Sequence, residues 1–487
     1  MNEHSLSKLR IICCKLSAKE GLMTDTGYVS FFETDCIYIE ENDCISIIPK
    51  DKDDIKKIRQ NFNKQRFFFY YTGTLGYNLA FIKRIQFEID NKVKLYPYYT
   101  INQYHENSFV RFDMVGDVID DFFKPSYYFY GKSQLVCMDS IDIIYNSIIA
   151  DKWSINFEGN IIHVTLSFGD ILRKGIASDL KLHAKLSVEF QETKDTQYIY
   201  RIYNLMVRFF EIVRYDTNYG NLQVDLFCKK QGEMFHNGQL YDFSLGQKDF
   251  HKANHEIEYK NYKSYIQQFL QFSADHLDYT LYHYPVNGIR YRGDHYTAID
   301  YINIFSAFEA ECHAKQEIYE NINTSNIQNI KDIMVTQLDE YPKNILTKEE
   351  LKFLENAKNR ILQLGTQYGQ VMKVMNAYQV LHKVLDKSIE NIFYLKEFRL
   401  KGHLQEKELK KIANFLVKER GKIAHGGFSG AFSDVDAQKI RFLEIITYAQ
   451  LLKRIGLKET DIERVIGAVF GCNYILFNEN ISKMKKK

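Results

Sequence analysis

Residues 404–430 read LQEKELKKIANFLVKERGKIAHGGFSG, and this stretch decides the fold of the C-terminal part of the chain. Its apolar residues recur at the three- and four-residue spacing of a helix with one buried face: Leu409, Ile412, Ala413, Leu416 and Val417. The next position on that face is Arg420, whose charge is costly to bury without a partner. Arg420 must therefore extend out of the core, pair with an acid or meet an anion.

A histidine follows at the end of the predicted helix. Gly426 and Gly427 are expected to stop the helix or its last turn, which leaves His425 near the C-terminus of the helix. The partial negative charge of a helix C-terminus attracts a protonated imidazole. The stretch therefore predicts a cation and a titratable imidazole close together at one helix end. A snorkelling Arg420 and a His425 that caps carbonyl groups would satisfy the same pattern.

Length and composition limit the possible number of domains and the possible binding partners. A chain of 487 residues exceeds what one hydrophobic core usually serves, so two domains, or even three, are expected. The 45% content of apolar residues is enough for sizeable cores. A net charge of +2 gives no overall attraction to nucleic acid, so any such binding must be local.

Cysteine usage and the chain's apolar segments bear on its compartment. The eight cysteines are scattered and include no C-x-x-C pair, which fits reduced thiols in the cytosol. The first residues, MNEHSLSKLR, lack the pattern of a signal peptide. The longest apolar run, residues 465–477, is interrupted and shorter than the ~20 residues that cross a bilayer. We therefore expect a soluble, cytoplasmic protein that does not enter a membrane.

The N-terminal half has the pattern of an antiparallel sheet. Runs rich in Ile, Val, Tyr and Phe alternate with Asp, Asn, Gly and Lys clusters, and the predicted strands are residues 9–16, 27–32, 36–40, 44–49, 67–72, 78–89, 92–99, 108–114, 127–130, 155–168 and 181–190. Their spacing favours a sandwich or a barrel-like domain. One helix, residues 197–214, and one hairpin, residues 221–243, are expected to follow.

Beyond about residue 256 the period becomes helical. The predicted helices are residues 259–274, 296–319, 327–341, 348–364, 367–384, 404–420, 434–455 and 461–477. Thr347 and Glu350 match a capping box, and Ser433 with Asp436 marks another helix start. The predicted class is α+β, with a β-rich region at residues 1–255 and an all-α bundle at residues 256–487.

The spacing of Arg420 and His425 is not specific by itself. A second pair with the same spacing, Arg290 and His295, occurs in Arg-Tyr-Arg-Gly-Asp-His. That copy lies in a Gly-containing connection before a helix, whereas the Arg420 copy closes a long amphipathic helix. The structural context distinguishes the two copies.

In that context the motif resembles the R-x4-6-H signature of the HEPN superfamily, helical domains that are commonly metal-independent endoribonucleases. Residues 418–427, KERGKIAHGG, are similar to the usual form of the signature. The segment Tyr301-Ile-Asn-Ile-Phe-Ser-Ala-Phe-Glu-Ala310 looks like the first helix of such domains, with Glu309 at the place of an inward acidic residue. One position departs from the family pattern, since Gly421 stands where Asn, Asp or His is frequent.

The resemblance implies a function and a set of residues. Arg420 and His425 would be catalytic, with Glu309 and Lys422 in support, in a homodimer formed through the helical domain. No metal and no cofactor are expected. The order of the two halves is similar to the ApeA-like group of anti-phage proteins, which implies abortive-infection cleavage of host RNA, such as tRNA, after a phage-derived trigger.

Chemistry independent of the family name fits this function. RNA carries its own nucleophile, the 2′-OH, so cleavage needs proton transfer and stabilisation of an anionic phosphorane but no metal. Two proton-transfer roles need filling and one chain supplies one His425. Two chains around a two-fold axis would supply both.

Several features allow other interpretations. Lys407, Lys411 and Lys418 lie on one helix face with Lys422 and could follow RNA phosphates, although a solvated face with intervening Glu residues explains them better. His251 and His255 could form half of a metal site, but no third ligand is nearby. The alternative functions are a non-catalytic HEPN-like module that binds RNA, a nucleotide or a protein, and a sugar- or protein-binding sandwich whose helical half dimerises.

Overall fold

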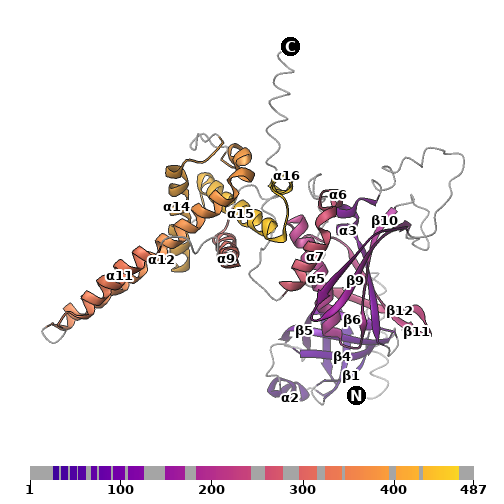
Figure 1. Cartoon of the computed structure of the whole chain (residues 1–487). Helices are drawn as coiled ribbons and strands as arrows, with labels where there is room; N and C mark the ends of the chain where they lie inside the picture. Colours follow the sequence, from indigo (N-terminus) through magenta and orange to yellow (C-terminus); the bar gives the residue numbers. More distant parts are fainter. Residues whose placement is uncertain are drawn as a thin grey trace, which may run out of the picture. The chain divides into compact units, whose positions relative to one another are not determined.

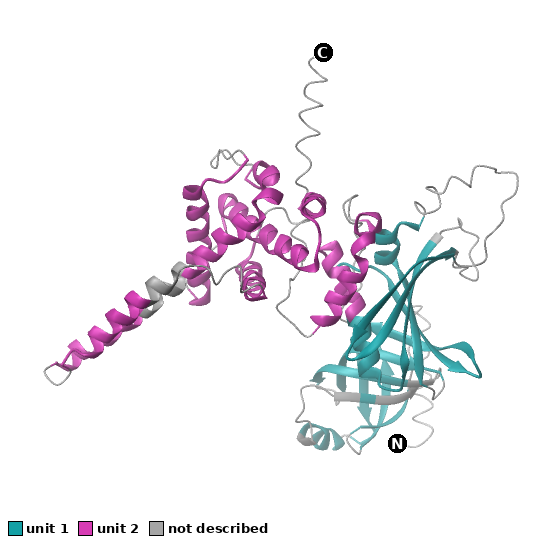
Figure 2. Ribbon diagram, in the orientation of Figure 1, with its two compact units in different colours: residues 1–204, 218–252 teal, residues 205–217, 253–487 magenta. Residues whose placement is uncertain are grey.

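The computed structural model describes residues 26–125, 148–170, 182–242, 258–277, 296–314, 324–393 and 402–470, apart from gaps at 32–33, 42–43, 52, 62–66, 74–75, 89–91, 105–107, 343–345 and 427–431. The chain divides into two compact units (Figure 2). Unit 1 comprises Met1–Asn204 and Asn218–Lys252, and unit 2 comprises Leu205–Thr217 and Ala253–Lys487. The chain therefore passes into unit 2 and back before the expected boundary at residue 255.

Unit 1 is built on one antiparallel sheet (Figure 1). Its strands are β1 (Thr26–Phe31), β2 (Thr34–Glu40), β3 (Ile45–Pro49), β4 (Phe67–Gly73), β5 (Gly76–Phe87), β6 (Val93–Gln103), β7 (Phe109–Gly116), β8 (Ile148–Phe157), β9 (Asn160–Asp170), β10 (Leu182–Thr193), β11 (Leu222–Lys230) and β12 (Glu233–Asp242). Its helices are α2 (Asp54–Asn61), α3 (Asp117–Phe123) and the first part of α5 (Thr196–Arg214). The predicted α+β class, with an antiparallel sheet before a helical region, is confirmed.

The order of the strands is β1-β2-β3-β6-β12-β11-β7-β10-β9-β8, with β5 also on β6 and β4 on β5. The described strands thus form one branched sheet. The branch lies at β6, whose N-terminal part pairs with β3 and whose C-terminal part pairs with β12. The sheet curls on this side of β6, so that the rings of Phe31 in β1 and Phe69 in β4 meet edge to face, with their centres 5.5 Å apart.

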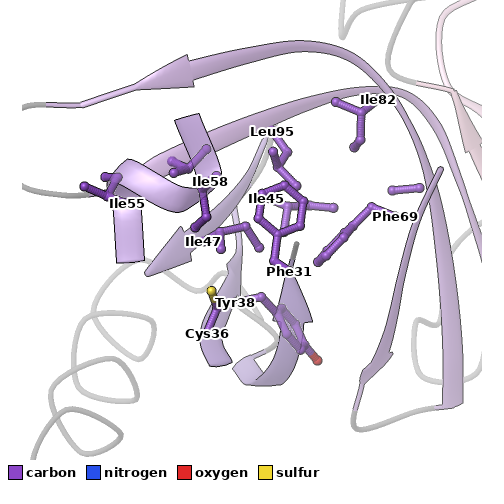
Figure 3. Packing of buried hydrophobic residues seen from close by; sticks show 12 residues of the cluster. Phe31, Cys36, Tyr38, Ile45, Ile47, Ile55, Ile58, Phe69, Ile82 and Leu95 are labelled. Carbon is purple, nitrogen blue, oxygen red and sulfur yellow. The ribbon is translucent and has the colours of Figure 1, made fainter. Parts of the chain in front are cut away.

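The curled part of the sheet encloses a core of its own (Figure 3). Ile45 and Ile47 of β3, Ile82 of β5 and Leu95 of β6 are fully buried there. Along the first part of β6 the buried residues alternate with half-buried ones, whereas in β3 Ser46, between Ile45 and Ile47, is buried as well. The helix α2 covers one side of this core with Ile55 and Ile58.

Two boundaries predicted from the sequence are wrong. The single strand expected at residues 155–168 is a hairpin of β8 and β9, because Glu158 and Gly159 both adopt positive φ and form a tight turn. The two helices expected at residues 348–364 and 367–384 are one helix, α12 (Lys348–Leu385). The glycine between the two predicted helices does not end the helix. A glycine inside a helix lowers its stability by only about 1 kcal/mol, which the rest of a long helix outweighs.

Other predictions agree closely with the structure. The expected helix at residues 197–214 is α5, and the expected hairpin is β11 and β12. The Thr347 and Glu350 capping box begins α12, and Ser433 accepts a hydrogen bond from the Asp436 N–H at the start of α15. The strands expected at residues 9–16 and 127–130 lie outside the described residues.

Unit 2 is helical. Besides α12 and the last part of α5 it contains α6 (Tyr259–Tyr262), α7 (Ile266–Asp275), α9 (Ala298–Ala314), α11 (Thr324–Asp339), α13 (Ile389–Ile392), α14 (Glu406–Ala424), α15 (Asp434–Ile455) and α16 (Glu459–Phe470), with short 3-10 turns at 263–265 and 386–388. The central helix is α15, which packs against α7, α9, α12, α14 and α16. None of the helices in the described ranges is both long enough and apolar enough to cross a membrane.

A buried polar cluster joins α7, α9 and α15. Arg454 donates two hydrogen bonds to Glu311, at 3.0 and 2.7 Å, and a third to Nε2 of His276 at 3.1 Å. The other ring nitrogen, Nδ1, lies 2.9 Å from the Phe272 carbonyl, so His276 is held as the neutral tautomer with the proton on Nδ1. Burial lowers the pKa of His276 most, the hydrogen bond to the Phe272 carbonyl opposes this in part, and the Arg454 charge lowers the pKa further against a smaller opposing effect of Asp275.

This cluster makes stability depend on pH. Because the pKa of His276 is lowered in the folded state, the unfolded chain takes up the proton first as the pH falls below about 6.5. The free energy of unfolding should therefore decrease from pH 7.5 to pH 5.5, and urea denaturation at both values measures the decrease. His276→Gln keeps a donor and an acceptor but cannot titrate, so its decrease should be smaller. Equal decreases for the two proteins would contradict this assignment.

Candidate functional site

The helix α14 forms with the face that the sequence predicts. Leu409, Ile412, Ala413, Leu416 and Val417 are buried, and the helix packs against α9, α12 and α15. Arg420 continues this face at the point where the bundle ends, and 45% of its side chain is exposed. The guanidinium therefore combines an anchored stem with an accessible head.

An acidic side chain from α9 contacts the guanidinium. Nη2 of Arg420 lies 3.4 Å from Oε2 of Glu309, and the guanidinium lies 5.9 Å from the centre of the Phe305 ring. Glu309 is the acidic residue that the sequence singled out, and it contacts Arg420. A pair this exposed contributes little to stability, so its main effect is to orient the guanidinium.

A third side chain completes the contact. Nε2 of Gln370, from α12, donates to Oε1 of Glu309 at 2.7 Å. Each oxygen of the Glu309 carboxylate thus has its own donor, which fixes the plane of the carboxylate and the edge that faces Arg420. Oε1 of Gln370 is itself buried and makes no hydrogen bond to a described residue. Residues from three helices therefore hold the guanidinium in place.

The turn that carries Arg420 is attached to α9 by a second bond. The Tyr301 hydroxyl donates to the carbonyl of Leu416, one turn before Arg420, and burial raises the pKa of Tyr301 strongly. Tyr301 is fully buried in α9, eight residues before Glu309. Because both residues project from the same rigid helix, the relation of Glu309 to Arg420 depends on this bond.

His425 lies at the end of α14. Its N–H bonds to the Gly421 carbonyl at 3.2 Å, and Gly426, at φ 72°, turns the chain out of the helix. The helix thus continues one turn beyond the predicted end at Arg420, and His425 is the C-cap residue. Its side chain is exposed, and its ring makes no recorded contact with another described residue. The imidazole is free to meet a ligand from solvent.

The four lysines lie as predicted on the outer surface of α14. Lys407, Lys411 and Lys418 are exposed. Lys422 is half exposed and pairs with Glu419 at 2.5 Å, so its charge is partly neutralised by a neighbour on its own helix. Within the described residues, none of the four lysines forms a hydrogen bond or an ion pair with Arg420 or His425.

Other sequence candidates are not brought to this site. His251, His255, Arg290 and His295 lie outside the described residues. Within the described parts of the chain, no three His, Cys, Asp or Glu side chains are grouped as metal ligands would be.

The contact residues Gln370, Phe305 and Tyr301 are additions to the sequence-based site. Tyr301 and Phe305 lie in the segment that carries the family resemblance, where their four- and eight-residue spacing to Glu309 places all three near one helix face. Gln370 is one of many polar residues in α12, and no sequence signal distinguishes it.

Comparisons with known proteins add no relative. Neither family models, nor curated proteins, nor solved structures gave a match to this chain. The function must therefore be argued from the site itself.

The glycine after Arg420 is not required by the backbone. Gly421 is helical without positive φ, and a Cβ built on it meets nothing within 4 Å. Gly421→Ala should therefore raise the free energy of unfolding by about 0.5–1 kcal/mol, because alanine loses less backbone entropy in a helix. Urea denaturation tests this. A decrease in stability would mean that a neighbour fills the space beside Gly421.

The Tyr301 hydroxyl should contribute to the stability of unit 2. Tyr301→Phe removes one buried hydrogen bond and keeps the ring, so a loss of about 1 kcal/mol is expected. Chemical denaturation measures the loss, and Tyr265→Phe, which removes a half-buried bond to Asp461, is a matched control in the same unit. Unchanged stability in Tyr301→Phe would show that the Leu416 carbonyl gains nothing from this hydroxyl.

Proposed function

We propose that the chain is a metal-independent endoribonuclease of the HEPN type, with Arg420 and His425 as its catalytic residues. The observation that carries this proposal is the end of α14. There, a guanidinium oriented by Glu309 and Gln370 remains half exposed, and an exposed imidazole follows five residues later. Both groups are open to a polynucleotide at the surface, as cleavage requires.

The residues divide the reaction between them. Glu309 contacts one nitrogen of the guanidinium, so other N–H groups of Arg420 can bind two oxygens of a phosphodiester. A His425 imidazole removes the proton from the ribose 2′-OH, and O2′ attacks the phosphorus while Arg420 stabilises the negative charge of the phosphorane. The bond from phosphorus to O5′ then breaks, and a second imidazole, protonated, gives its proton to O5′. The products are a 2′,3′-cyclic phosphate and a 5′-hydroxyl.

The biological setting is proposed from the family resemblance alone. Cleavage of tRNA or another host RNA would stop growth during phage infection, in an abortive-infection defence. Unit 1 would recognise a phage-derived trigger or select the substrate, and the enzyme would act in the cytoplasm. Such a nuclease is toxic to its host, so restraint before the trigger is part of the proposal.

The test uses purified protein with total RNA and with single-stranded DNA, both in the presence of EDTA. RNA should be cut and DNA left intact, because DNA lacks the 2′-OH. Arg420→Ala and His425→Ala should each lower the rate at least ~100-fold, in line with the loss of a general acid–base or a phosphate-stabilising group. The RNA ends should be 2′,3′-cyclic phosphate and 5′-hydroxyl.

Two substitutions in the same unit serve as matched controls. Arg464 is 46% exposed and paired with Asp461, much as Arg420 is paired with Glu309, and His313 is an exposed histidine at the end of α9. Arg464→Ala and His313→Ala should cut RNA at the original rate. RNA that is bound but not cut would support the non-catalytic binding module. If RNA is neither bound nor cut, the results would favour the other alternative, in which unit 1 recognises a sugar or a protein.

A further inference from the structure

Two histidines lie close together where α12 ends and α14 is about to begin. His382 is in the last turn of α12, and His403 lies just before the start of α14. Their ring centres are 5.7 Å apart, and the ring planes are nearly perpendicular, at 84°. The side chain of His403 is 53% exposed, and His382 is partly exposed. An ion from solvent can therefore reach the pair.

An acid orients the ring of His403. Its Nδ1 lies 3.2 Å from each carboxylate oxygen of Asp386. An ionised carboxylate only accepts hydrogen bonds, so Nδ1 carries the proton and Nε2 of the neutral ring keeps its lone pair. The Tyr378 hydroxyl donates to the same carboxylate at 2.6 Å and accepts from the Leu404 N–H at 2.9 Å. Tyr378 thus holds both Asp386 and the backbone beside His403 in place.

His382 has the same arrangement with a different acceptor. Its Nδ1 lies 2.7 Å from the Gln379 carbonyl, which also only accepts. Nε2 of His382 is therefore the unprotonated nitrogen of its neutral ring as well. Among the described residues, no hydrogen-bond partner is recorded for Nε2 of either histidine. The pair thus presents two lone pairs that have no other use in the fold.

This arrangement is the one that histidine ligands of metal ions adopt. Such histidines donate the N–H of the other ring nitrogen to a carboxylate or a backbone carbonyl, which fixes the tautomer and the ring orientation. His403 uses the carboxylate of Asp386, and His382 uses the carbonyl of Gln379. The C-terminal end of α12 also favours a cation, because the helix dipole is negative there.

The distance between the rings is close to that of a chelating pair. Two imidazoles on one tetrahedral Zn²⁺, each bound at about 2.0–2.1 Å, have their ring centres about 5 Å apart. The 5.7 Å between His382 and His403 exceeds this only slightly, and a small rotation of the half-exposed His403 ring removes the difference. Imidazole nitrogen suits Zn²⁺ and similar transition metals, whereas Mg²⁺ and Ca²⁺ prefer oxygen ligands.

We propose that His382 and His403 bind one Zn²⁺ through their Nε2 atoms, with Asp386 as the positioning residue for His403. Two protein ligands leave the other positions of the ion to water, so this is an open site that binds an exchangeable ion more weakly than a closed site would. The bound ion joins the end of α12 to the residues that precede α14. Zinc binding should therefore stabilise unit 2.

This site is separate from the proposed chemistry at Arg420 and His425. From Glu406, at the start of α14, to Arg420 the helix rises about 21 Å. Zinc at His382 and His403 therefore takes no part in RNA cleavage, and the zinc proposal stands or falls without the nuclease proposal. An Arg420→Ala/His425→Ala protein should still bind zinc at this site.

Isothermal titration of the full chain with zinc chloride tests the site. The protein carries no polyhistidine tag and is first freed of metal with a chelator. The original chain should bind one Zn²⁺ more than either His382→Ala or His403→Ala, and Mg²⁺ should not bind at this site. His313→Ala, which removes an exposed histidine at the end of α9, is the matched control and should bind zinc as the original chain does. Zinc binding that survives either substitution unchanged overturns the proposal, as does an original chain that binds no zinc.

The role of Asp386 is tested separately. Asp386→Asn keeps both ligands but removes the negative charge behind His403, so it should weaken zinc binding about 10–100-fold. Thermal unfolding with and without zinc supplies a second measurement, since zinc should raise the Tm of the original chain more than that of His403→Ala. Circular dichroism without zinc would establish that the variants are folded. An unchanged zinc affinity in Asp386→Asn would contradict the positioning role of this carboxylate.

Discussion

Burial of α15 on all sides is the constraint on which the helical unit depends. Fourteen of its residues are buried, and helices contact it around its circumference. One of those buried residues is an acid, Glu444, which receives hydrogen bonds from the hydroxyls of Tyr215 and Tyr296 at 2.7 and 2.8 Å. A buried carboxylate is tolerated only with such partners. Glu444 therefore determines which segments of the unit can lie beside α15.

The same helix sets the position of the candidate site. Near the C-terminal end of α15, Arg454 donates two hydrogen bonds to Glu311 of α9. These bonds fix the rotation of α9 about its axis. Two residues earlier, on a different side of α9, Glu309 then faces α14 and Arg420. The buried acid of α9 thus has a structural role, and the half-exposed acid is left to orient a charge at the surface. Close packing transmits the position of one to the other.

The sequence predicts what depends on local pattern. The buried face of α14, the bounds of α15 and the capping box at Thr347 follow from periodicity and capping chemistry, and the structure has all three. The turn at Glu158 and Gly159 was missed because β-branched and aromatic residues surround it and only one turn-forming glycine marks it.

The long-range contacts at the site could not be predicted from the sequence for a different reason. Gln370 reaches Glu309 across 61 residues, and many polar residues of α12 could have met α9 equally well. Only the packing of α12, α9 and α14 selects this one. The sequence alone does not determine the pairing of Glu309 with Arg420, because a glutamate on α9 could have paired with any nearby cation. Helix positions are readable from periodicity, whereas partners depend on how the helices are rotated.

Geometry along α14 argues that one chain does not hold a complete site. Arg420 and His425 are five residues apart, which in a helix corresponds to a rise of about 7.5 Å and a rotation of about 140°. The two side chains therefore leave the helix in different directions, and a phosphate bound to Arg420 lies away from the imidazole of the same chain. Two proton transfers also require two imidazoles. For the proposed reaction, a two-fold arrangement would bring the imidazole of the second chain to a phosphodiester bound by the Arg420 of the first.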